Sequence, residues 1–169
     1  VMAKKGNILT PKQFQRQWMH ALHRYQLNVW NFQAEAGRAG VEVFKGSFPM
    51  RRLNTSSSKP WKKRSKTWRK KHPILEETGT LKNSIEWKYL GGVGGKKGVR
   101  IYTNPTKFYT AKRHRGFCYA AIHNDPDGSH TYGRSGVPSV QRQFIGNSSF
   151  LDRKLKVLAP MIFKGFPGL

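Results

Sequence analysis

Cysteine and long apolar runs are nearly absent from this sequence. Cys118 is the single cysteine among 169 residues, which excludes an internal disulfide and a zinc site built from several cysteines. No apolar run approaches the roughly 20 residues that a membrane-spanning helix needs. The basic N-terminus is followed by GNILTPKQ, where a secretory signal would place an apolar stretch. We therefore expect a soluble protein of a reducing compartment, with no membrane partner.

Acidic residues are scarce as well. The chain has 8 Asp+Glu against 32 Lys+Arg, which gives a formal net charge of +24. No acidic residue lies between Glu42 and Glu76, or between Glu86 and Asp125. A surface this basic repels itself and favours an anionic partner. Nucleic acid, an acidic protein surface and anionic lipid all fit that description, and charge alone does not choose among them.

The few carboxylates do not form a catalytic arrangement. Glu76 and Glu77 are sequence neighbours, and adjacent residues do not face each other on a helix. Asp125 and Asp127 flank a proline in a turn, where aspartate commonly accepts hydrogen bonds from the backbone. We therefore expect no pair of carboxylates that would serve in acid–base catalysis.

Histidine and cysteine give no stronger signal for chemistry. His20 and His23 have a helical spacing that would suit a metal, but no acidic or cysteine partner is close in sequence. Cys118 and His123 lie in an apolar segment, where a buried structural cysteine is commoner than a nucleophile. We expect no catalytic residue, no metal and no cofactor.

Aromatic residues, by contrast, are plentiful. Ten Phe, six Tyr and five Trp argue for a folded protein, because disordered basic tails lack such residues. The length fits a single domain, 1–169. We divide it into an N-terminal lead and long helix (1–46), a basic loop (47–74), and a sheet with a C-terminal helix (75–169).

A long amphipathic helix is predicted to begin after Thr10. Thr10, Pro11 and Gln13 combine an N-cap, a proline at the first helical position and a capping box. Apolar residues then recur at helical spacing up to the expected C-cap Gly46, namely Phe14, Trp18, Ala21, Leu22, Tyr25, Val29, Phe32, Ala36, Ala39 and Val43. Such a helix measures about 50 Å, which is longer than a domain of this size. We therefore expect it to project, to kink near Gly37 and Gly40, or to pack against a neighbouring subunit.

Apolar residues off the main stripe favour the contact with a neighbouring subunit. Met19, Leu27 and Trp30 give the helix a second contact surface, although a purely internal core is the alternative. The residues expected at a subunit or partner contact are Phe14, Trp18, Tyr25, Trp30 and Phe32.

Two basic stretches, 47–74 and 106–116, are predicted to be loops that contact an acidic partner or nucleic acid. The expected contact residues are Arg51, Arg52, Lys62, Lys63, Arg64, Lys66, Arg69, Lys70, Lys71, Lys112, Arg113 and Arg115. Trp61 and Trp68 lie among these charges, and aromatic rings in such a setting can stack on bases. The alternative is a solvated loop whose two tryptophans are fixed in the core.

A small antiparallel sheet is predicted after the first basic stretch. Ile85, Trp87 and Tyr89 alternate with polar residues, as in a strand with one buried face, and a short helical turn leads into it. The glycine-rich stretch 90–98 is expected to be a hairpin loop, because it lacks the Gly-Lys-Ser/Thr ending of a phosphate-binding loop. A second strand is expected at 99–103.

The C-terminal part is predicted to contain a buried segment, a loop, a last strand and a helix. Residues 117–123 (FCYAAIH) fit a buried strand or a short helix, and 124–136 are rich in turn residues. Alternation at 140–144 predicts the last strand. A capping box at Ser149 opens the final helix, which Pro160 should kink or break.

Three segments, in order, resemble the motifs of a known family. Residues 75–85 (LEETGTLKNSI) resemble L-x-x-T-G-x-L-x-x-S-I, residues 119–123 (YAAIH) resemble Y-A-x-x-H, and residues 137–146 (VPSVQRQFIG) resemble I-P-x-R-P-F-L-G. These motifs are typical of phage virion-morphogenesis and tail-completion proteins, which act at the neck between head and tail or in closing the tail. The resemblance covers about residues 61–165.

The resemblance implies an α+β fold, with a long N-terminal helix packed on a small antiparallel β-sheet and a C-terminal helix. It also implies a ring of identical, non-enzymatic subunits in the virion at the head–tail interface, assembled in the host cytoplasm. The implied neighbours are portal, head-adaptor, tail-tube or terminator proteins, with DNA in the lumen as a further candidate. The motif residues would be structural: Thr78, Gly79, Leu81, Ser84, Ile85, Tyr119, His123, Pro138, Arg142, Phe144 and Gly146.

Two other interpretations are open. One is a basic nucleic-acid-binding module, ribosome-associated or DNA-binding, in which the two basic loops contact phosphates. The other is an enzyme whose site follows no recognisable pattern.

Overall fold

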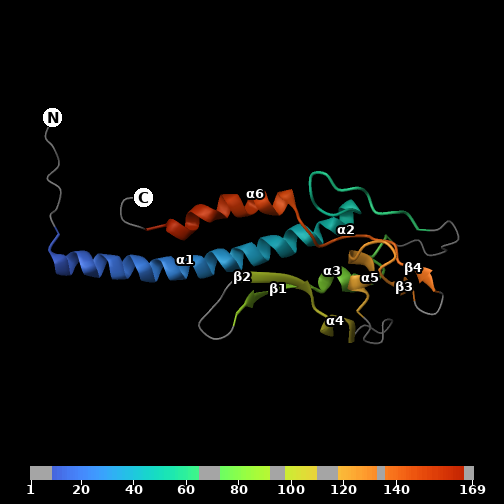
Figure 1. Cartoon of the computed structure of the whole chain (residues 1–169), viewed down its shortest axis with the longest axis horizontal. Coiled ribbons are helices and arrows are strands. Elements are labelled where there is room, and N and C mark those ends of the chain that lie inside the picture. The colour runs from blue at the N-terminus through green and yellow to red at the C-terminus, as the bar shows by residue number, and fades with distance from the viewer. Residues whose placement is uncertain (1–8, 65–72, 92–97, 110–117, 133–135, 166–169) are drawn as a thin grey trace.

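Helix α1 (Pro11–Lys45) is the central element of the computed structural model, and most of the other elements pack along or beyond its C-terminal half (Figure 1). The structure describes residues 9–64, 73–91, 98–109, 118–132 and 136–165. Helix α6 (Ser149–Leu158) lies on one side of α1, and the hairpin of β1 (Ile85–Leu90) and β2 (Gly98–Thr103) lies on the other. This confirms the expected α+β fold.

Helix α1 begins and ends where the sequence predicts. The Gln13 N–H donates to Thr10 Oγ1 at 3.3 Å, and the Thr10 N–H donates to Gln13 Oε1 at 2.9 Å, which completes the capping box. Gly46 is the C-cap. The helix continues unbroken through Gly37 and Gly40, and its first turns extend beyond α6 and the hairpin (Figure 1). The structure therefore confirms that this long helix projects, and it contains no kink at Gly37 or Gly40.

Two glycines allow the hairpin to approach α1 closely. A Cβ atom at Gly37 would lie 2.4 Å from the ring of Trp87, and one at Gly40 would lie 2.0 Å from Ile101 Cδ1. Trp87 and Ile101 face each other in the antiparallel register of β1 and β2. Leu151 of α6 lies 3.7 Å from the same position at Gly40. One segment of α1 therefore meets both neighbouring layers.

The main core lies beyond the C-terminal end of α1. Its most buried large side chains, each at most 1% exposed, are Phe48, Phe108, Phe144, Leu81 and Ile85. Short helices supply much of it: α2 (Ser47–Met50), α3 (Thr80–Asn83), α4 (Thr106–Tyr109) and α5 (Ala120–Asn124). Helix α3 is the predicted turn into β1, and α5 shows that the apolar segment before position 124 contributes a short helix. Because α2 is helical, the first basic loop starts at Arg51 and not at position 47.

The last strand predicted at 140–144 is wrong. In the part of the chain that the structure describes, the second sheet consists of β3 (Thr131–Tyr132) and β4 (Val137–Pro138), which pair antiparallel. A strand therefore lies inside the segment 124–136 that the sequence indicated as a loop.

Hydrogen bonds to helix α5 explain why the segment after β4 is not a strand. The Arg142 N–H donates to His123 O at 2.7 Å, and the N–H groups of Phe144 and Ile145 donate to Asn124 Oδ1 at 3.2 and 3.0 Å. The hydrogen-bond acceptors of these N–H groups are therefore the C-terminal end of α5 and the Asn124 side chain, and not a neighbouring strand. Arg142 and Phe144 are still buried in alternation, which is the pattern that the sequence displays.

The end of the chain needs one correction. Ser148, and not Ser149, is the N-cap of α6, since Ser148 Oγ accepts from the Leu151 N–H at 3.3 Å. The break at Pro160 is confirmed, because α6 gives way to the 3₁₀ helix η2 (Ala159–Phe163) there.

We expect Gly37→Ala and Gly40→Ala each to lower the free energy of unfolding by about 1–3 kcal/mol, the usual cost of overpacking. Alanine favours an exposed helix by about 1 kcal/mol over glycine, so the close contact with the hairpin decides the sign. Gln15→Ala, on the exposed part of α1, is the control and should change little. Denaturant unfolding measures all three proteins. Stabilisation by either glycine substitution would mean that the hairpin does not pack on α1 as described.

Candidate interaction surfaces

The first candidate surface is an exposed apolar face on the N-terminal half of α1. Successive helical residues are about 100° apart, so Phe14, Trp18, Leu22 and Tyr25 fall on one face, which we call the α1 ridge. Their exposed fractions are 53%, 42%, 48% and 37%. Val43 lies on the same face further along the helix and is 3% exposed. A stripe that is buried near the core therefore continues along the projecting turns, where its large side chains are exposed and Ala21 is buried.

A second exposed apolar face occupies the same turns. Met19, Leu27 and Trp30 are 62%, 42% and 48% exposed, and they lie off the ridge as the sequence indicated. Phe32, in contrast, is half-buried. Of the five residues expected at a subunit contact, the other four are exposed.

Basic side chains lie on the same turns of α1, but on other faces of the helix than the α1 ridge. Lys12, Arg16 and Arg24 are exposed on the same turns, and the first acidic residue of the chain is Glu35. The projecting half of α1 therefore presents apolar and positive groups together.

The C-terminal end of the ridge contacts η2. The rings of Tyr25 and Phe163 are 6.2 Å apart between centroids. Asn28 Nδ2 donates to Ile162 O at 3.2 Å and to Lys164 O at 2.9 Å, which fixes the end of the chain on α1. Nearer the N-terminus the Phe14 and Trp18 rings, 6.0 Å apart, pack on each other.

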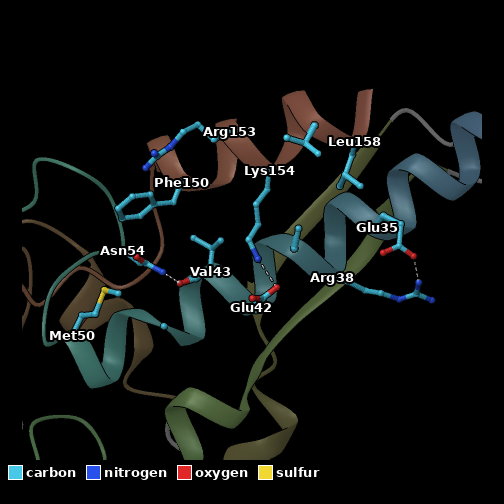
Figure 2. A pocket seen from close by; sticks show the side chains of 13 residues that line it. Glu35, Arg38, Glu42, Val43, Met50, Asn54, Phe150, Arg153, Lys154 and Leu158 are labelled. Carbon is cyan, nitrogen blue, oxygen red and sulfur yellow. Dashed lines mark hydrogen bonds and ion pairs between the residues drawn. The ribbon is translucent and has the colours of Figure 1, made fainter. Parts of the chain in front are cut away.

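The second candidate surface is a groove of about 1040 Å³ between α1 and α6 (Figure 2). We call it the α1–α6 groove. Its apolar lining consists of Ala39, Val43, Met50, Phe150, Val157 and Leu158. Met50 and Val157 remain 49% and 80% exposed. The sequence did not predict this groove, because its two sides are more than 100 residues apart in the chain.

Charged side chains also line the α1–α6 groove. Lys154 reaches from α6 to α1, where its Nζ lies 2.6 Å from Glu42 Oε2 (Figure 2). Arg38 forms an ion pair with Glu35 on α1. The guanidinium of Arg153 lies 4.6 Å from the centre of the Phe150 ring. The groove therefore combines an apolar lining with accessible charges of both signs.

The described part of the first basic loop is a third candidate surface. Arg51, Arg52, Lys62 and Lys63 are exposed, whereas Arg64 is half-buried and donates to Pro73 O at 3.0 Å. The remaining predicted contact residues, together with Trp68, lie outside the described residues: Lys66, Arg69, Lys70, Lys71, Lys112, Arg113 and Arg115.

Trp61 is a core residue and is not available to stack on bases. It is 7% exposed, its ring packs edge-on against Phe48 at 5.7 Å, and its Nε1 donates to Gln143 O at 2.8 Å. For this tryptophan, the prediction of a side chain fixed in the core is confirmed.

The three segments that carry the family resemblance meet in the core. Leu81, Ile85, Ala120 and Phe144 belong to one cluster of buried apolar side chains, with Tyr119 packed against it. Their positions span the first, second and third segments, which are far apart in sequence. Members of all three segments therefore pack together in one core.

The polar members of these segments have local structural contacts. Gly79 has φ 69°, a conformation that suits glycine, and caps the start of α3 beside Thr78, whose hydroxyl lies 2.8 Å from that of Thr80. Ser84 Oγ donates to Leu81 O at 2.7 Å. Pro138 lies opposite Thr131 in the second sheet. A Cβ atom at Gly146 would collide with the side-chain amide of Gln143.

Tyr119 and His123, which are partly buried, form a polar group with the buried Arg142. The Tyr119 and His123 rings are 5.9 Å apart. Burial, and then the charge of Arg142, lower the pKa of His123 to about 4. Burial, with the charges of Glu77 and Cys118, raises the pKa of Tyr119 to about 12. Both rings are therefore uncharged at neutral pH.

We expect stability to fall by about 2 kcal/mol between pH 7 and pH 5 through His123 alone. Its pKa is about 4 in the folded chain and near 6.5 when unfolded, so the unfolded chain takes up the proton first as pH falls. This contribution is complete above pH 6.5 and is lost towards pH 4. Denaturant unfolding of the wild type and of His123→Gln at both pH values measures it. Equal pH dependence in the two proteins would contradict the assignment.

Among the described residues, no group of three or more side chains is placed to hold a metal ion. Nor does any helix in the described ranges have the length and apolar character needed to cross a membrane. No family model, no curated protein and no solved structure matches this chain.

Proposed function

We propose that this chain is a structural protein of a tailed bacteriophage, a subunit of a ring at the head–tail connection or at the tail end. The observation that carries the proposal is the exposure of large apolar side chains on the projecting half of α1. The family resemblance adds the biological setting. The packing of its three segments into one core supports that resemblance, because motif residues of a structural subunit should serve folding.

The exposed apolar residues favour assembly with other copies. Phe14, Trp18, Leu22, Tyr25 and Trp30 follow one another over less than half of α1. Soluble monomers rarely expose a contiguous apolar surface of this kind, and larger ones mark interaction sites. In a closed ring each subunit makes the same contact twice, so that both of its contact surfaces are covered.

The charge of +24 favours partners with acidic surfaces. Exposed Arg51, Arg52, Lys62 and Lys63 lie near the opposite end of α1 from the ridge. They are available to portal, head-adaptor or tail-tube proteins while the ridge serves assembly, and to DNA in the lumen. The uncharged, partly buried rings of His123 and Tyr119 suit a packing role, in keeping with a protein that is not an enzyme.

The second candidate function is a nucleic-acid-binding module. The exposed arginines and lysines at positions 51–63 favour it, since such side chains contact phosphates. The burial of Trp61 counts against base stacking at this site. The described part of the loop therefore offers charge without an accessible aromatic ring.

Light scattering of the purified chain tests the proposal. We expect a particle of several copies at about 0.3 M salt, where the repulsion between copies is screened, and a ring in electron micrographs. A second experiment measures the affinity for duplex DNA at about 50 and 200 mM salt, because binding to phosphates weakens by orders of magnitude over that range. A monomer at every concentration, combined with tight and salt-sensitive DNA binding, would favour the second candidate and contradict the first.

A further inference from the structure

Two layers flank α1, and they are held to it in different ways. On one side the hairpin of β1 and β2 reaches the α1 backbone itself, because Gly37 and Gly40 have no side chains in its way. On the other side a groove of about 1040 Å³ remains between α1 and α6 (Figure 2). We propose that α6 and η2, residues 149–163, form a strap that lifts off α1 as one unit while the hairpin stays docked.

The strap contains no buried residue, and the structure describes all of it. Val157 and Phe163 are 80% and 51% exposed. In the hairpin, by contrast, Ile85 at the start of β1 is 1% exposed and belongs to the main core. Elements with few buried apolar contacts open at a lower free energy than the rest of a protein. The strap is therefore the layer that opens first.

Hydrogen bonds fix the N-terminal end of the strap to the loop after α2. Ser148, the N-cap of α6, is 4% exposed, and its Oγ donates to Asn54 O. The Ser149 N–H donates to Thr55 Oγ1 at 3.1 Å, and the Ser56 N–H donates to Ser149 Oγ at 3.1 Å. This end stays attached when the rest of the strap lifts, and it is the hinge.

The middle of the strap is linked to α1 only weakly. Phe150 and Leu151, in the first turn of α6, still pack against the main core. Further along, Lys154 Nζ lies 2.6 Å from Glu42 Oε2, but the two side chains are 43% and 72% exposed (Figure 2). Ion pairs in contact with water contribute little to stability. This link therefore does not hold the strap closed.

Asn28 of α1 holds the far end of the strap. Its Nδ2 donates to Ile162 O at 3.2 Å and to Lys164 O at 2.9 Å. The Phe163 ring lies between these two carbonyl groups in the sequence and contacts Tyr25. One side chain thus joins two backbone groups at the end of η2 to α1, and we call Asn28 the latch.

A lifted strap would not stay helical. Helix α6 has 10 residues, and isolated helices shorter than about 12–15 residues are marginal in water. Pro160 prevents α6 from growing longer at its C-terminal end. Release from α1 therefore unfolds the strap at the same time, so that its amides become accessible to water together.

Lifting the strap would lengthen the exposed apolar face of α1. Ala39 and Val43 line the groove beside α6 and are 9% and 3% exposed while the strap is closed. Val43 lies on the same face of α1 as the α1 ridge. The strap therefore sets how much apolar surface α1 presents, whether or not the chain forms a ring.

Native-state hydrogen exchange of the dilute full chain tests the strap. When closing is fast, the exchange of each amide follows the population of its open form. We expect the protection factors of α6 and η2 to be at least about tenfold lower than those of the amides paired between β1 and β2. We also expect the strap amides to share one opening free energy as denaturant is added.

Asn28→Ala removes the latch, and circular dichroism should show that this variant folds as the wild type does. Each of the two lost hydrogen bonds is worth about a factor of five. The strap amides should therefore exchange about 5- to 25-fold faster, while those of β1 and β2 keep their rates. Asn31→Ala is the matched control, because it makes the same exchange of residue type at an exposed position of α1. It should leave the strap amides unchanged.

Each outcome decides for or against the strap. Strap amides as slow as those of the hairpin would contradict it, because both layers would then open only together. An effect of Asn28→Ala confined to the amides next to the latch would mean fraying of the chain end, and an equal effect in the hairpin would mean global unfolding; both results overturn the proposal. Acceleration across the whole strap that is absent from the hairpin and from Asn31→Ala supports it.

Discussion

The close approach of three elements at Gly37 and Gly40 is the constraint on which the structure depends. The absence of side chains at these positions lets Trp87 and Ile101 of the hairpin reach the α1 backbone. Helix α6 packs on the adjoining face of the same turns. Because both layers meet α1 in its C-terminal half, no described element other than η2 and the end of α6 is left to cover the N-terminal half. The exposed ridge follows from that placement.

The chain combines two properties that oppose each other in water. Its charge of +24 drives copies apart, while its ridge and groove leave apolar surface exposed. In the proposed ring, short-range apolar contacts between copies would act at ordinary ionic strength, where charges beyond about 10 Å are screened.

Local patterns in the sequence predicted the elements that depend on local physics. The capping box at Thr10, the alternation from Ile85 to Tyr89 and the break at Pro160 each appear in the structure. The extended segment around Arg142 was misread, because its alternating burial mimics a strand while its hydrogen bonds go to α5. The exposed aromatic residues of α1 could be selected from their helical spacing. The groove could not, since it forms only when α6 packs beside α1 from the far end of the chain.

Amide hydrogen exchange along α1 tests the central claim most directly, namely that other copies cover the projecting turns. An isolated helical end frays, because most helical stability in proteins comes from tertiary packing. The account predicts fast exchange for the amides of Phe14 to Tyr25 in dilute protein and at least about tenfold slower exchange once the chain assembles. Exchange in these turns that stays equally fast at every concentration, while the particle mass rises, would contradict it.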